Sequence, residues 1–207
     1  MMESFKLVHL VATAAGAILL NSPAYAADAS GLFAVRGLGA NTCQEYLNRK
    51  ATDENSRLYA SWLMGYMTAR NRVEEKRFDV LPYPDGQVFL EAVQAVCRDQ
   101  TTVTIEQAAS SVISALAPIH QVNVSPITVV ENKNRSLQIR QSALAALQSK
   151  LIEDGLYSGP VNGEWSEAMV TAVTEFQLSS KIVASGLPDL ATLIHALVLD
   201  RPHRANP

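Results

Sequence analysis

The sequence predicts a mainly α-helical protein built from two small helical domains. Apolar residues recur at helical spacing over most of the chain after residue 40, and helix-capping patterns precede several of these stretches. Between them, residues 119–134 contain Pro and Asn and lack a helical period. The length of 207 residues suits this division. We therefore expect a four-helix domain within residues 27–118, a linker at 119–134, a three-helix module at 135–199 and a tail at 200–207.

The composition excludes several classes of protein. Apolar residues make up 48% of the chain and charged residues 18%, a mixture typical of a folded domain rather than a disordered one. The formal net charge is −3, so the chain has no basic field that would attract nucleic acid. Four His and two Cys leave little material for a zinc site. We expect no metal, no cofactor and no nucleic-acid partner.

Residues 1–26 have the layout of a secretory signal peptide. Lys6 precedes an apolar stretch from Leu7 to Leu20, and the small-x-small triplet Ala24-Tyr25-Ala26 follows. We expect cleavage after Ala26, a periplasmic mature protein and no integral membrane anchor after cleavage. The alternative is an uncleaved anchor, but the apolar run is short for a span of about 20 residues.

If the protein is exported, its two cysteines are expected to have a structural role. Cys43 and Cys97 are the only pair in the chain, and in an oxidising compartment such a pair is expected to form a disulfide. The alternative is a redox or nucleophilic thiol, which the absence of a C-x-x-C motif and of a neighbouring histidine disfavours. In the chain-entropy model, closing this loop would destabilise the unfolded chain by about 4 kcal/mol.

Four helices are expected in the first domain. A capping box at Thr42–Glu45 begins a short helix that runs through Leu47, and a second box at Thr104–Gln107 begins the fourth helix. Gly65, inside the long second helix, indicates the close approach of another element. The apolar positions expected to face the core are Leu58, Trp62, Tyr66, Ala69 and Val73 in the second helix, which should end at Lys76, and Val88, Ala92, Val93, Val96 and Cys97 in the third.

Three helices are expected in the second domain. Ser136 can cap a helix that ends before Gly155, and Ser166 can cap the next one. The third helix contains Thr192 and Leu197. Residues 156–163 between the first two helices form a turn-rich loop. Residues 127–130 in the preceding linker could instead form a short strand docked on either domain.

An ordered set of short elements in the second domain resembles the peptidoglycan-binding domain family, a three-helix module found attached to cell-wall enzymes. The family usually has Asp where this chain has Asn162, and Gly where it has Ser166. The matching elements, over about residues 136–198, are Leu147-Gln148, Leu151, Gly155 to Gly159, Val161-Asn162-Gly163, Ala172-Val173, Phe176-Gln177, Gly186 to Asp189, Thr192 and Leu197.

The resemblance implies that this module binds peptidoglycan. We expect ligand contact at the loop, with Tyr157 as an exposed stacking or hydrogen-bonding platform and Ser158, Asn162 and Trp165 around it. Gln148 and Gln177 stand beside core positions, where we expect their amides to satisfy loop carbonyls.

The first domain resembles the HdeA-like superfamily more diffusely. The resemblance rests on Cys43, the Trp62-x-x-Gly65-Tyr66 segment and Cys97-Arg98-Asp99, over about residues 41–117. Members of that superfamily are small periplasmic helical proteins held by one disulfide. They include acid-stress chaperones and immunity proteins that neutralise type VI secretion effectors. The resemblance implies a protein partner for this domain.

We expect no catalytic residue. After the signal peptide the chain has only His120, His195 and His203, and it has neither a G-x-S-x-G nor an H-E-x-x-H motif. The predicted function is therefore that of a non-catalytic exported protein that binds peptidoglycan and presents a protein-binding domain. The alternative is an accessory cell-wall hydrolase with chemistry in the first domain, for which Glu91 is the nearest candidate carboxylate.

Overall fold

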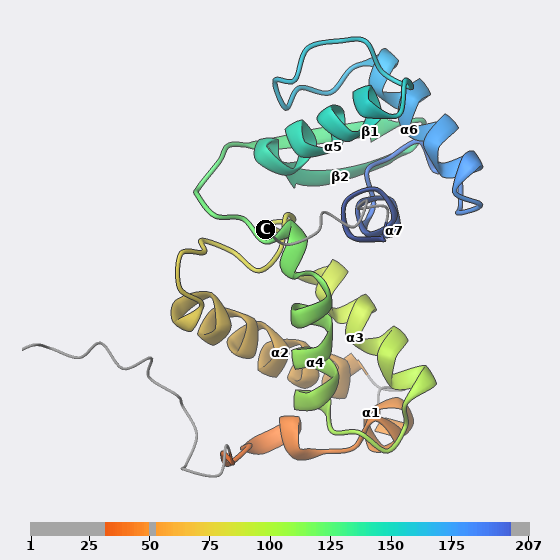
Figure 1. Ribbon diagram of the computed structural model, residues 1–207. Helices are drawn as coiled ribbons and strands as arrows, with labels where there is room; N and C mark the ends of the chain where they lie inside the picture. Colours follow the sequence, from red (N-terminus) through yellow and green to blue (C-terminus); the bar gives the residue numbers. More distant parts are fainter. Residues whose placement is uncertain (1–31, 50–52, 200–207) are drawn as a thin grey trace, which may run out of the picture. The chain divides into compact units, whose positions relative to one another are not determined.

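The computed structural model describes residues 32–49 and 53–199 (Figure 1). The predicted signal peptide at residues 1–26 and the tail at 200–207 lie outside the described residues. The fold below is that of the compact unit Val35–Pro207. It is mainly helical, as predicted. None of the described helices is both long enough and apolar enough to cross a membrane.

The helical part begins with a 3-10 turn, η1, and contains four α-helices. Both predicted capping boxes are confirmed. The Thr42 hydroxyl accepts the Glu45 N–H while the Glu45 carboxylate accepts the Thr42 N–H, and Thr104 and Gln107 repeat the pattern. The elements are η1 (Gly37–Ala40), α1 (Cys43–Arg49), α2 (Asp53–Val73), α3 (Gln87–Asp99), α4 (Ile105–Ala115) and a second 3-10 turn η2 (Ala117–Ile119).

The predicted disulfide is present. It joins Cys43, the first residue of α1, to Cys97 near the end of α3, and both residues are fully buried. Beside it, the Cys43 N–H donates to the carbonyl of Val103, which lies just before α4. The disulfide and this bond hold the starts of α1 and α4 against the end of α3.

The buried face of α2 differs from the predicted one. Leu58 and Val73 are 51% and 64% exposed, and Ala69 is also exposed, whereas Tyr59 and Leu63 are buried. Trp62 and Tyr66 pack against the core as expected, but they are only partly buried, and the fully buried positions lie beside them at Tyr59 and Leu63. Period alone did not distinguish the two stripes, because both carry apolar residues at intervals of three and four.

Two further expectations about this helix are wrong. It ends at Val73, before Lys76, which has a left-handed backbone with φ of 57°. Gly65 is exposed, and a Cβ added to it would have no atom of another element within 4 Å. Hence no close approach explains that glycine.

An antiparallel hairpin precedes the module helices (Figure 1). Strand β1 is Ile127–Asn132 and strand β2 is Arg135–Arg140, paired from Ile127 with Arg140 to Asn132 with Arg135. The strand kept open as an alternative for residues 127–130 is therefore what the segment forms. The domain boundaries drawn at 118 and 135 stay a prediction.

Ser136 lies in β2, so the predicted helix cap at that residue is wrong. Helix α5 begins at Gln141 instead, with Arg140 as its N-cap. The reason is tertiary: Ser136 pairs with Glu131 across the hairpin, and the strands alternate, with Leu137 and Ile139 of β2 turned inward and Ser136 and Gln138 exposed.

The module then follows the predicted order. Helix α5 is Gln141–Glu153, α6 is Glu167–Ser179, and α7 is Leu190–Leu193, which continues as a π-helix, η3, over Ile194–Leu199. Ser166 caps α6 as expected by accepting the Met169 N–H. The core of this part consists of Val130, Ile139, Leu144, Leu147, Leu151, Met169, Val173, Phe176, Leu187 and Leu193.

Buried polar contacts join the helical part to the module. The Tyr83 hydroxyl donates to the Pro188 carbonyl at 2.8 Å, and the Arg140 guanidinium pairs with the Asp79 carboxylate at 3.1 Å. Arg140 also donates its backbone N–H to Pro82 and lies over the ring of Phe78. These contacts fix the start of α5 against the loop before α3.

Candidate functional site

A buried glutamine organises the loop between α5 and α6. Gln148 is fully buried, and its side-chain oxygen accepts the N–H groups of Asn162 and Gly163 at 2.9 and 2.8 Å. Its nitrogen donates to the Glu164 carbonyl at 2.9 Å. One amide thus replaces the solvent for three backbone groups, and the expectation that it bonds loop carbonyls is confirmed.

Gln177 repeats the arrangement at the next loop. It is also fully buried; its oxygen accepts the Gly186 N–H, and its nitrogen donates to the Leu187 carbonyl and the Thr192 hydroxyl. Both glutamines therefore hold a left-handed glycine, with φ of 70° at Gly163 and 63° at Gly186. The Leu147-Gln148 and Phe176-Gln177 elements are explained by this clamping of loops.

The position of Gly163 admits no side chain. An added Cβ would lie 2.5 Å from the Gln141 carbonyl oxygen at the start of α5. The loop backbone therefore touches α5 directly, which places residues 162–165 beside the hairpin.

Three of the four predicted ligand residues lie at the surface of this loop. Ser158 and Asn162 are exposed and Trp165 is half-buried. Tyr157 is only 9% exposed, so its ring is largely covered, and its contact with a ligand stays a prediction. Its backbone N–H bonds the Leu151 carbonyl, and its ring lies so close to Gly159 that a Cβ there would fall 2.2 Å from the hydroxyl oxygen.

Trp165 links the loop to the hairpin. Its indole N–H donates to the Glu131 carbonyl of β1 at 3.0 Å. Beside it, the Asn162 amide donates to the Glu164 carboxylate at 2.7 Å. The loop and the strand enclose an open depression lined by Thr128, Val129, Glu131, Gln141, Glu164 and Trp165.

The sequence identified only Trp165 among these lining residues. The contribution of β1 was missed because the segment was assigned to a linker. A sequence signal that could have found it is the β-branched run from Ile127 to Val130, followed by the turn residues Asn132 and Asn134.

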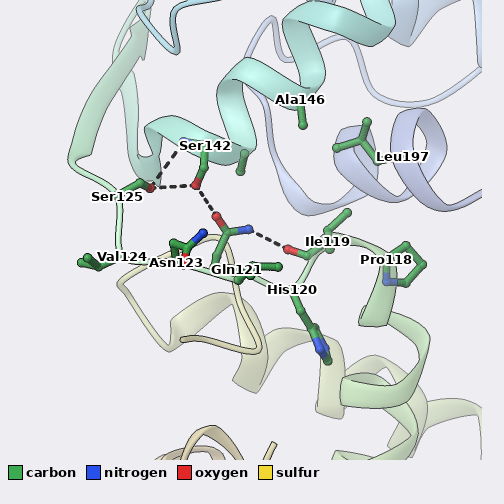
Figure 2. A pocket seen from close by; sticks show the side chains of 12 residues that line it. Pro118, Ile119, His120, Gln121, Asn123, Val124, Ser125, Ser142, Ala146 and Leu197 are labelled. Atoms are coloured by element: carbon green, nitrogen blue, oxygen red, sulfur yellow. Dashed lines mark hydrogen bonds between the residues drawn. The ribbon is translucent and has the colours of Figure 1, made fainter. Parts of the chain in front are cut away.

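A second hollow lies where residues 118–125 pass the start of α5 (Figure 2). Its polar groups bond one another: the Ser142 hydroxyl lies 2.6 Å from the Gln121 side-chain oxygen and 2.7 Å from the Ser125 hydroxyl, and Gln121 donates to the Ile119 carbonyl. The remaining lining is largely apolar, from residues such as Val124, Ala146 and Leu197. These bonds brace the segment between η2 and β1.

His120 lies in the same segment and is buried. Its Nε2 atom is 3.0 Å from the Ile113 carbonyl at the end of α4, and no described residue bonds Nδ1. Because a carbonyl only accepts, Nε2 carries the proton in the neutral ring. Burial lowers the pKa of His120, partly opposed by its bond to the Ile113 carbonyl and assisted by nearby Arg77.

The described residues hold no group of three or more His, Cys, Asp or Glu side chains arranged to bind a metal ion. Glu91, the carboxylate considered for hydrolysis, is exposed on α3 and accepts a hydrogen bond from Gln87. Glu91 therefore has the setting of an ordinary surface residue.

The geometry thus defines a small helical module whose two loops are clamped by buried glutamines. In a comparison with protein families, residues 140–195 match the family model described as a putative peptidoglycan binding domain. This segment runs from the cap of α5 into η3. Searches of curated proteins and of solved structures gave no match. The helical part, residues 37–119, lies outside the matched segment, so its resemblance to the HdeA-like superfamily stays a prediction.

Proposed function

We propose that this protein is a non-catalytic peptidoglycan-binding factor of the periplasm. The observation that carries the proposal is the family match at residues 140–195, because it falls on a module whose clamped loops are complete. The Cys43–Cys97 disulfide and the module together indicate an extracytoplasmic protein. Export and cleavage after Ala26 are part of the proposal.

The binding surface we propose is the exposed part of the loop between α5 and α6, together with Trp165. Ser158 and Asn162 offer a hydroxyl and an amide at the surface, and the Trp165 ring offers a flat apolar face. Asn162 is held in place by the Glu164 carboxylate, so its amide is pre-oriented.

The helical part has a different role in this proposal, which is to bind another protein. Its diffuse resemblance to the HdeA-like superfamily supports a stress chaperone or an inhibitor of a wall-degrading effector. The wall-bound module would keep this part at high local concentration near such a partner. The buried Arg140–Asp79 pair and the Tyr83–Pro188 bond would hold the helical part and the module together as one body.

Sedimentation with insoluble sacculi tests the proposal. The mature chain, residues 27–207, should sediment with them, and Trp165→Ala should reduce the bound fraction several-fold. Gln138→Ala is the matched control, because Gln138 is exposed on β2 and lines neither hollow. A mature chain that stays in the supernatant would contradict peptidoglycan binding.

The same sacculi test the alternative of a cell-wall hydrolase. A non-catalytic protein releases no soluble muropeptides during prolonged incubation. If the wild type released muropeptides and Glu91→Gln did not, the protein would be a cell-wall hydrolase instead.

A further inference from the structure

Strand β1 has one edge that no other strand covers. The two-stranded sheet contains only β1 and β2, so among the described residues the far edge of β1 has no strand partner. The Glu131 carbonyl points to this edge, where it accepts the Trp165 indole N–H. Backbone groups alternate in direction along a strand, so Val129, two residues earlier, also directs its N–H and C=O outward.

This edge forms one wall of the depression beside Trp165. Val129 is 53% exposed, and Thr128 and Glu131 lie on either side of it. The opposite wall comes from Gln141, Glu164 and Trp165. The unpaired backbone donor and acceptor of Val129 therefore stand along this open groove.

The charged residues that line the groove are all acidic. Of the six described residues that line it, Glu131 and Glu164 are carboxylates and none is basic. Both carboxylates are exposed. An occupant with a free amine would match this charge, and the Trp165 ring could cover the aliphatic part of its side chain.

We propose that this groove binds an extended peptide that carries a free amine, added to β1 as a further strand. The inference rests on the proposed function: the ligand is the stem peptide of peptidoglycan, whose third residue commonly bears such an amine, and not its glycan chain. Main-chain bonds to Val129 supply affinity, and Glu131 with Glu164 selects the cationic side chain. Strand β1 lies outside the segment that matches the family model.

Calorimetric titration of the full mature chain tests the charge recognition. The probe is a synthetic stem tetrapeptide with lysine at its third position, compared with the same peptide acetylated on the lysine amine. Loss of the charge should weaken binding about fivefold, the upper range for exposed ion pairs. Because only the ligand changes, a folding defect cannot imitate the result.

A substitution at Val129 tests the strand addition. Val129→Pro removes the outward N–H and no bond to β2, a position at which edge strands tolerate proline. It should weaken binding of the free-amine peptide about tenfold. Val129→Ala is the matched control, since it keeps the N–H, and it should bind within about twofold of the wild type. Circular dichroism of both variants should match the wild type.

Each outcome decides between the two proposals. Equal binding of the free and acetylated peptides, or wild-type affinity in a folded Val129→Pro, would overturn the peptide groove. Sedimentation with sacculi and no binding of either peptide would also overturn it, while leaving glycan recognition as the proposed function. If the mature chain bound neither sacculi nor peptide, both proposals would fall.

Discussion

At the scale of single residues, two glycines with the same backbone conformation should differ sharply in what they tolerate. Gly155 and Gly163 have φ of 73° and 70°, but only Gly163 faces a backbone oxygen at 2.5 Å from an added Cβ. Gly155→Ala should cost about 1–2 kcal/mol through left-handed strain alone. Gly163→Ala should cost about 3 kcal/mol or more, because steric overlap adds to that strain. Urea unfolding of both variants measures the difference, and equal losses would contradict the close approach.

Gln148 provides the second prediction at this scale. Gln148→Ala removes three hydrogen bonds to backbone groups of the loop, besides one to the Asn162 side chain, and leaves the buried Gly163 N–H without its acceptor. We expect a loss of about 3 kcal/mol in the free energy of unfolding, at about 1 kcal/mol for each bond. The exposed Gln138→Ala should stay within about 0.5 kcal/mol of the wild type. A Gln148→Ala protein as stable as this control would mean that water replaces the amide.

At the scale of elements, the disulfide between α1 and α3 should contribute much of the stability of the helical part. It encloses a sequence separation of 54 residues, for which the chain-entropy model gives about 4 kcal/mol. The double variant Cys43→Ala, Cys97→Ala should lose about that amount in urea unfolding. A reducing agent should lower the wild-type midpoint and leave that of the variant unchanged. A variant as stable as the oxidised wild type would contradict the model.

His120, between η2 and β1, should make stability depend on pH. Burial lowers its pKa in the folded protein, so below about pH 6.5 the unfolded chain binds a proton that the folded chain still excludes. Stability should therefore fall as the pH decreases from about 6.5 toward the lower pKa of the folded state. The charges facing this ring are Arg70, Glu74 and Arg77.

The substitution His120→Gln removes the titration while its amide can still donate to the Ile113 carbonyl. The free energy of unfolding, measured by urea between pH 7 and 5, should decrease less steeply in this variant. Parallel curves for variant and wild type would show that His120 does not carry the effect. Titration of the imidazole by NMR gives the folded pKa directly.

The elements that sequence predicted well are those whose signals are local. Thr42, Thr104 and Ser166 cap helices where the pattern placed them, since a cap needs only its next three residues. The predicted cap at Ser136 was wrong because pairing of this residue with Glu131 in β1 outweighs its capping preference. That pairing depends on tertiary structure. For the same reason the sequence pointed to Trp165 in the loop, whereas the lining of the same depression by Val129 and Glu131 depends on the hairpin and was missed.

At the scale of the whole molecule, the compact unit Val35–Pro207 should unfold as one body because a buried ion pair joins its two parts. Arg140, at the start of the module, is only 8% exposed and pairs with Asp79 of the helical part. Asp79→Ala leaves the guanidinium buried without its counter-charge, which should cost about 3–5 kcal/mol. Breaking the exposed Arg49–Glu45 pair with Arg49→Ala should cost less than about 1 kcal/mol.

Differential scanning calorimetry distinguishes this coupling from two independent domains. The mature wild type should give one transition, with equal calorimetric and van't Hoff enthalpies. Combining Asp79→Ala with Tyr83→Phe, which removes the bond to Pro188, should split it into two, because both contacts cross between the parts. Two transitions in the wild type would contradict the coupling.

A single transition has a functional consequence. A ligand bound to the module then stabilises the helical part as well, so sacculi or stem peptide should raise the melting temperature of the whole unit.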